Sequence, residues 1–175
     1  AKDGRIRAAA VRALANGIDM IPNATDLLAR LVADEHPRVR LETVRTLGHI
    51  KSARATALAL SVLEKPMDPF LDYALWLTIN ELAEPWLAAL KSGDWKPEGR
   101  EQQFEFALKS IEPALASEVL DKLVGNQGVP RDGSGPWIEI IGAAGGRKEL
   151  RQLFDPLVRG EFEKSVALRV FTALN

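Results

Sequence analysis

Four arginines recur at matching places in the N-terminal part of the chain, and their side chains could bind anions. Arg7 and Arg12 are followed 33 residues later by Arg40 and Arg45. A guanidinium group donates paired hydrogen bonds to phosphate or carboxylate oxygens, so a row of them could hold a phosphate. Repetition also fits a structural role, in which each arginine pairs with an acidic side chain or a carbonyl of the next repeat. We favour this role and predict that Arg7, Arg12, Arg40 and Arg45 form a structural ladder.

Tryptophan offers a second binding chemistry, because an exposed indole supplies a large contact area at little cost in conformational entropy. Trp76 falls at a periodic position and is predicted to lie in the core. Trp86 stands at a helix start and Trp95 in a turn, so these two are expected to be the more exposed, although ordinary packing is the favoured interpretation. Together with Lys91 they form the candidate partner-binding set.

The residue types that most often carry catalysis or bind metals are scarce. Cysteine is absent, and the two histidines, His36 and His49, fall at a helix start and a helix end, where capping or a solvated turn explains them. Residues 125–136 are rich in glycine but lack the Gly-Lys-Ser/Thr ending of a phosphate loop, so we expect a flexible surface insertion. The oxygen-bearing side chains of this loop do not match the spacing of a calcium loop: Asn126, Asp132 and Ser134. We predict no catalytic residue, no cofactor and no metal site.

Composition sets broader limits on function. Hydrophobic residues make up 46% of the chain and charged residues 27%, which is typical of a globular domain. The formal net charge is −1, whereas a nucleic-acid-binding protein needs clustered lysines and arginines, so this class is disfavoured. No apolar run approaches the length of about 18 to 20 residues that spans a bilayer, and there is no signal-peptide pattern. The chain starts just before a helix cap at Asp3, and we expect it to be a segment excised from a longer protein.

Residues 34–48 have the pattern of one complete helix, and this pattern recurs along the chain. Pro37 suits the first helical position, and Gly48 is predicted to end the helix in the left-handed conformation. Residues 5–14 repeat the pattern 33 positions earlier, and a step of 32 leads to a third copy that starts at Pro69. The core positions of the second copy and their counterparts in the third are Val39, Val44 and Leu47, then Leu71, Trp76 and Ile79. A fixed period of this length indicates a repeat protein.

The predicted fold is therefore all-α, a right-handed α-α superhelix of about eleven helices. Prolines mark helix starts and glycines mark helix ends throughout, and they divide the chain into five and a half repeats of 32–33 residues. We predict a single repeat domain over residues 1–175, interrupted by the loop at 125–136. Since each repeat packs on its neighbours, a charge at Leu47 should disturb two adjoining repeats.

The motif residues resemble the first helix of a HEAT repeat, and the short step is similar to the compact bacterial variety: Asp34, Pro37, Val39, Arg40, Val44, Leu47 and Gly48. A closer resemblance rests on 26–30, 36–42 and 65–77. These stretches are similar to the HEAT segment of large bacterial proteins that join a sugar-dehydrogenase-like β-propeller to a cytochrome c module, and the similarity covers about residues 1–95. The resemblance implies a connector or docking surface in a parent protein that is periplasmic or exported. Because the chain has neither a Cys-x-x-Cys-His haem motif nor a propeller pattern, the activities of those two modules do not carry over to it.

The function predicted from the sequence is that of a non-enzymatic scaffold or protein-interaction module. It would present a concave surface, formed by the second helix of each pair, to a protein partner or to neighbouring domains of its own chain. One alternative is a nucleic-acid-binding HEAT-like module. Another is the structural frame of a redox enzyme whose catalytic modules lie outside this chain.

Overall fold

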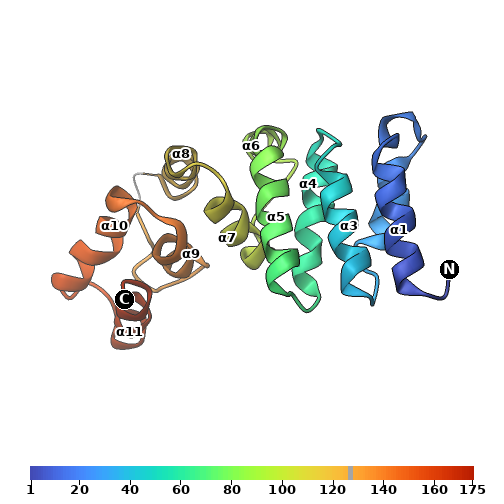
Figure 1. The fold of residues 1–175 in the computed structure, drawn as a ribbon. Coiled ribbons are helices and arrows are strands. Elements are labelled where there is room, and N and C mark those ends of the chain that lie inside the picture. The colour runs from blue at the N-terminus through green and yellow to red at the C-terminus, as the bar shows by residue number, and fades with distance from the viewer. Residues whose placement is uncertain (126–127) are drawn as a thin grey trace. The chain divides into compact units, whose positions relative to one another are not determined.

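The structure is a computed structural model that describes residues 1–125 and 128–175, so Asn126 and Gln127 of the predicted loop lie outside the described residues. The fold is all-α, as predicted: the described residues form eleven α-helices and two short 3₁₀-helices, and they contain no strand (Figure 1). Contacts divide the chain into two compact units, an N-terminal unit of residues 1–103 and a C-terminal unit of residues 104–175. The single domain, the number of repeats and the right-handed superhelix stay predictions.

The N-terminal unit consists of helix pairs in two layers. The first helices of the pairs, α1, α3 and α5, pack side by side, and the second helices, α2, α4 and α6, follow the same order behind them (Figure 1). The bounds are α1 Gly4–Ala15, η1 Ile18–Met20, α2 Ala24–Leu31, α3 Pro37–Leu47, α4 Ala53–Leu60, η2 Ser61–Glu64, α5 Pro69–Glu81 and α6 Ala83–Ser92. A further helix, α7 Glu101–Ser110, begins at the boundary between the units.

Local sequence signals explain where these helices begin. The Asp3 side chain accepts a hydrogen bond from the backbone N–H of Arg5 and caps α1, as predicted. Pro37 and Pro69 occupy the first turn of α3 and α5, where a missing N–H costs nothing. Asp68 caps α5 by accepting from two backbone N–H groups. The helices then bury a continuous apolar core whose largest members are Leu28, Leu47, Leu60, Leu71, Leu75, Ile79, Leu82 and Trp86.

The end of α3 differs from the prediction. Gly48 was expected to be left-handed, but its φ is −57° and its ψ −26°, which is ordinary right-handed geometry. The reason for glycine here is the close approach of α5. A Cβ atom on Gly48 would lie 3.1 Å from a carboxylate oxygen of Glu81 and 3.6 Å from Cγ2 of Thr78, both on α5.

The burial of Trp76 was also predicted wrongly. Its side chain is 40% exposed and stacks on Tyr73, with ring centroids 6.0 Å apart, while the preceding residue, Leu75, is fully buried. The equivalent pair in α3, Thr43 and Val44, is buried at both positions because α3 packs against α1 on one side and α5 on the other. The repeat step therefore places the backbone correctly, but burial depends on the neighbours of each helix.

The C-terminal unit contains α8 Pro113–Val124, α9 Trp137–Ala144, α10 Arg147–Val158 and α11 Lys164–Ala173. Helices α9 and α11 approach closely at Gly142, where a Cβ atom would lie 2.5 Å from the carbonyl oxygen of Ala173. The unit has its own core: Val124, Val129, Ile138, Ile141, Leu153, Phe162, Val166 and Val170. Since Val129 belongs to this core, the described part of the loop is anchored, and the prediction of a simple surface insertion is wrong there.

Candidate functional site

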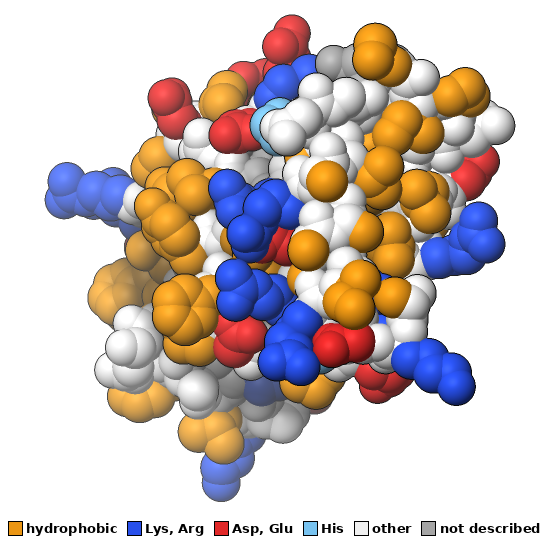
Figure 2. Space-filling view, turned by 45° about the vertical axis from the view of Figure 1, so that its right-hand side comes forward, with side chains coloured by type: hydrophobic (Ala, Val, Ile, Leu, Met, Phe, Trp, Pro, Cys, Tyr) orange, Lys and Arg blue, Asp and Glu red, His pale blue; other side chains and the backbone are white. Residues whose placement is uncertain are grey.

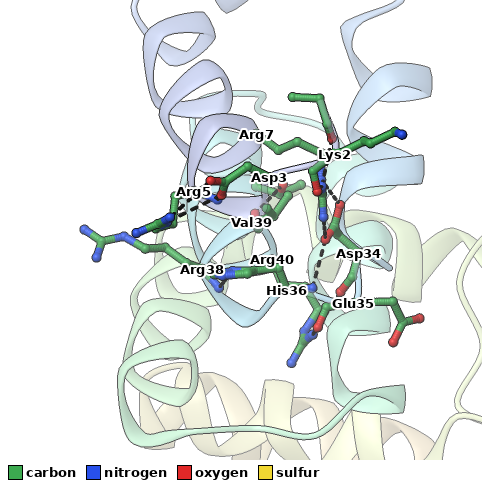
Figure 3. Close-up of polar contacts among 12 residues, drawn as sticks. Lys2, Asp3, Arg5, Arg7, Asp34, Glu35, His36, Arg38, Val39 and Arg40 are labelled. Carbon is green, nitrogen blue, oxygen red and sulfur yellow. Dashed lines mark hydrogen bonds and ion pairs between the residues drawn. The ribbon is translucent and has the colours of Figure 1, made fainter.

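Arg7 contacts the start of the next repeat. Its Nε and Nη2 atoms each donate to one carboxylate oxygen of Asp34, both over 2.8 Å, and Nη1 donates to the carbonyls of Ala1 and Lys2. Figure 3 shows the two side chains pointing toward one another between α1 and the start of α3. The hydrogen bond from Arg7 lowers the pKa of Asp34, outweighing the effect of partial burial, which raises it.

Arg40 makes the corresponding contact one repeat later, but with carbonyl groups. Its Nη1 donates to the carbonyls of Asp34 and Glu35 at 2.9 Å and 3.1 Å, and Nη2 donates to the carbonyl of Pro66 at 2.7 Å. Pro66 stands 32 residues after Asp34, so the partner of the guanidinium changes from a side chain to the backbone. Arg40 is buried, and these bonds offset the cost of removing its charge from water.

Arg12 and Arg45 share one buried carboxylate, that of Glu42. Arg12 reaches it from the preceding repeat through a hydrogen bond, whereas Arg45 lies on the same helix, with Nη1 3.7 Å from the other carboxylate oxygen. The residue 32 positions after Glu42 is Ala74, so α5 offers Arg45 no equivalent carboxylate. Of the four arginines, three thus form hydrogen bonds with the following repeat, whereas the ion pair of Arg45 lies within α3. Their energetic role as a ladder stays a prediction.

The candidate partner-binding residues do not form an exposed surface. Trp86 is 0% exposed and Trp95 is 3% exposed, so the favoured interpretation, ordinary packing, is confirmed for both. The expectation that they would be more exposed than Trp76, which is 40% exposed, is wrong. Their rings meet edge to face, with centroids 5.7 Å apart, in the core under α6. Lys91 is exposed on α6. A binding role for this set therefore loses the indole surface on which it depended.

The structure places a different apolar surface between α3 and α5, which we call the α3–α5 groove. It is a depression of about 670 Å³. Its lining includes two aromatic rings, two aliphatic side chains and two basic ones: Phe70, Tyr73, Leu41, Leu77, Arg45 and His49. Phe70 is 78% exposed and Tyr73 61% exposed, which is unusual for aromatic side chains. A second depression, of about 410 Å³, shares Leu41, Arg45 and Phe70 and adds Arg12 and Arg38. Figure 2 shows Lys and Arg side chains beside hydrophobic ones on one face of the molecule.

The sequence of α5 carries a signal for this groove that the core pattern alone does not explain. Phe70, Tyr73 and Leu77 are spaced i, i+3, i+7, so they form a second apolar stripe on α5 next to the core stripe of Leu71 and Leu75. A helix with two apolar stripes is buried on more than one side or has a surface left for a partner. The structure leaves this second stripe exposed.

The residues most often used in metal sites and catalysis do not gather in the described parts of the chain. No group of three or more His, Cys, Asp or Glu side chains that could hold a metal ion occurs among the described residues. His36 Nδ1 accepts from the backbone N–H of Arg38 and so caps α3, and His49 is exposed at the rim of the groove. Helices of sufficient length and apolar character to cross a membrane are likewise missing from residues 1–125 and 128–175.

Comparison with known families agrees with this architecture. Residues 1–76, which comprise α1 to the middle of α5, match the family model described as HEAT repeats. This match agrees with the HEAT motif predicted from the sequence of the same region. No curated protein and no solved structure matches the chain. The similarity to proteins with propeller and cytochrome c modules stays a prediction.

Proposed function

We propose that this protein is a non-enzymatic interaction scaffold whose N-terminal unit binds an acidic, amphipathic segment of a partner protein in the α3–α5 groove. The observation that carries the proposal is the exposure of Phe70, Tyr73 and Leu77 in one depression together with Arg45. Large aromatic side chains and arginine are the residue types that contribute most to protein interfaces. Stacked helical repeats offer extended surfaces for such contacts.

The groove lies on the first-helix layer, not on the second-helix surface expected from the sequence. Within the N-terminal unit, the exposed large hydrophobic side chains belong to α1, η1 and α5: Ile6, Met20, Phe70, Tyr73, Trp76 and Leu77. The described residues of α2, α4 and α6 contribute none to this set. An interface based on apolar burial is therefore favoured on the α3–α5 side.

Charge favours an acidic partner. Arg12, Arg38 and Arg45 line the two joined depressions, and the acidic side chains there are Glu42, Asp68 and Glu81. These six charges sum to zero, but Glu42 is buried, whereas the Arg12 and Arg45 side chains that bind it are 57% and 63% exposed, so cationic groups reach the solvent there. Acidic groups around an apolar stripe would complement this surface and accelerate association.

The alternative functions remain proposals of lower rank. A nucleic-acid-binding role still conflicts with the net charge of −1 and the exposed aromatic groove. A role as the frame of a redox enzyme, in an exported parent protein, depends on modules outside this chain. Neighbouring domains of the same chain could supply the acidic segment as well as a separate protein.

Selection of peptides tests the proposal. A phage-displayed library of random 16-residue peptides would be selected on the immobilised chain, and enriched sequences measured by fluorescence anisotropy. We expect enriched peptides to combine acidic and apolar residues, and the double variant Tyr73→Ser/Arg45→Gln to weaken their binding at least tenfold. Phe171→Ser, which removes an exposed aromatic ring from α11, is the matched control and should bind normally. Failure to enrich any such peptide, or equal binding by the double variant, would refute the proposal.

A further inference from the structure

A second surface, in the C-terminal unit, is strongly basic and independent of the α3–α5 groove. It is a depression of about 740 Å³ along α10, and we call it the α10 basic pocket. Its cationic side chains outnumber its one carboxylate, Asp155, by five to one: Arg131, Arg147, Lys148, Arg151 and Arg159. The volume lies in the range of about 300–1,000 Å³ that is usual for small-molecule sites.

The cations of this pocket are only partly neutralised. Arg131 and Arg159 share a single carboxylate, that of Glu161, at 3.0 Å and 2.6 Å. Arg147 and Arg151 form no ion pair within the described part of the chain. The pocket therefore carries excess positive charge, and two of its guanidinium groups are not already bound to a carboxylate.

Lys148 is less available to a ligand than these two arginines. Its Nζ lies 2.5 Å from a carboxylate oxygen of Asp121 on α8, and that contact raises the pKa of Lys148. The remaining candidates, Arg147 and Arg151, are four residues apart and so project from the same face of α10. Two guanidinium groups on one face can hold two anionic groups, or two edges of one phosphate.

The position of Arg147 and Lys148 conflicts with the ordinary rules of helix stability. Both lie in the first turn of α10, where the positive end of the helix dipole disfavours cations. Glu149, in the same turn, offsets part of this cost, because its carboxylate accepts from the backbone N–H of Gly146 as well as from the hydroxyl of Ser117. A local cost of this kind is expected where the residues serve a binding site.

We propose that the α10 basic pocket binds a small molecule that carries two or more phosphate groups, with Arg147 and Arg151 as the principal phosphate ligands. Asp155 lies one turn further along the same face and repels such an anion, so it sets an upper limit on affinity. The proposal therefore predicts that neutralising Arg147 and Arg151 weakens phosphate binding, whereas neutralising Asp155, one turn further along α10, strengthens it.

Titration calorimetry of the full 175-residue chain with inorganic pyrophosphate and tripolyphosphate tests the site. The expected result is binding that weakens at least tenfold in Arg147→Gln/Arg151→Gln and tightens two- to threefold in Asp155→Asn. The double variant Arg30→Gln/Lys122→Gln removes two exposed cations elsewhere and should bind as the parent does. Circular dichroism of each variant would verify its helical content.

Thermal unfolding supplies a second readout that a purely structural role would not produce. Without ligand, Arg147→Gln should melt at the same or a higher temperature than the parent, because it removes a cation from the helix N-terminus. Pyrophosphate should raise the melting temperature of the parent and not that of Arg147→Gln/Arg151→Gln. The proposal is overturned if pyrophosphate does not bind, if both double variants weaken binding equally, or if single-stranded DNA binds more tightly than tripolyphosphate per phosphate group.

Discussion

The two units of this chain both join helices through arginine–carboxylate bridges, but these bridges differ in their exposure to solvent. In the N-terminal unit α1, α3 and α5 follow one another at a nearly constant step, and arginines of one repeat bind groups of the next, as Arg7 does with Asp34. In the C-terminal unit α9 and α11 meet at Gly142, and Arg169 of the later helix donates two hydrogen bonds to Glu139 of the earlier one. Of these two bridges, the one in the N-terminal unit is the more shielded from solvent.

The third repeat lacks the two arginines that recur in the first and second repeats. The positions of Arg40 and Arg45 are taken 32 residues later by Asp72 and Leu77. Leu77 belongs to the exposed groove, and the family match ends at residue 76, inside the same helix. The helix at which the arginine ladder ends is thus also the helix that offers an apolar surface.

Leu47→Asp should have the largest effect on stability, and we expect it to unfold the N-terminal unit. Leu47 is fully buried on α3 between two neighbouring helices, and an unpaired charge there should lower the free energy of unfolding by more than about 4 kcal/mol. Tryptophan fluorescence would detect the loss, because Trp76, Trp86 and Trp95 lie in this unit. Leu168→Asp, on the exposed face of α11, is the control, and a parent-like melt of Leu47→Asp would contradict the expectation.

Gly142→Ala tests the close contact of the C-terminal unit. The added Cβ atom would lie 2.5 Å from the carbonyl oxygen of Ala173, so α9 and α11 must move apart, at a cost of about 1–3 kcal/mol. Denaturant unfolding monitored by circular dichroism measures the change. Gly17→Ala is the matched control, since the nearest atom to its new Cβ would be 4.0 Å away. Equal stability of the two variants would show that the helices do not depend on this glycine.

Asp34→Asn compares the bridges of the two units directly. Arg7 and Asp34 are mostly shielded from solvent, so loss of the charged hydrogen bonds should cost about 1.5–3 kcal/mol. Glu139→Gln alters the more exposed bridge to Arg169 and should cost less than about 1 kcal/mol. Urea unfolding gives both values. A larger loss of stability for Glu139→Gln than for Asp34→Asn would show that the Arg169–Glu139 bridge is the stronger of the two.

Acid should weaken the same N-terminal bridge. The pKa of Asp34 in the folded protein lies below the ordinary value of 3.8, so the unfolded chain takes up its proton first as the pH falls. The contribution of the pair is therefore complete above about pH 5 and is lost as the pH drops through 3.8 and the lower folded-state pKa. Unfolding free energies measured between pH 7 and pH 2.5 should fall more steeply for the parent than for Asp34→Asn. If the unfolding free energies of the parent and of Asp34→Asn fall in parallel with pH, Asp34 does not contribute to the loss of stability in acid.

Arg45→Gln should have the smallest effect on stability, within about 0.5 kcal/mol, because the side chain is exposed and its ion pair with Glu42 spans 3.7 Å. Differential scanning calorimetry is sensitive enough to detect a larger loss. Such a loss would place Arg45 in the ladder after all. A normal melting curve combined with weaker binding of the selected peptides would assign it to the groove.

Much of the fold was accessible from the sequence because its signals are local. The prolines at 37 and 69, the caps at Asp3 and Asp68 and the 32–33-residue period act within a few residues of each helix end, and the structure agrees with them. The arginine positions likewise follow from the period. Their partners do not, because Pro66 and Ala74 replace the acidic residues that serve the first repeat.

Burial and grouping were decided by the tertiary structure alone. Trp86 and Trp95 became core residues and Trp76 became exposed because burial depends on which helices pack on each side, and no local pattern contains that information. The α10 basic pocket brings together Arg131, from the loop, and Arg159, which is twenty-eight residues later in the sequence. The sequence by itself determined helices, caps and spacing. The three-dimensional packing determined which side chains remain for a ligand or a partner.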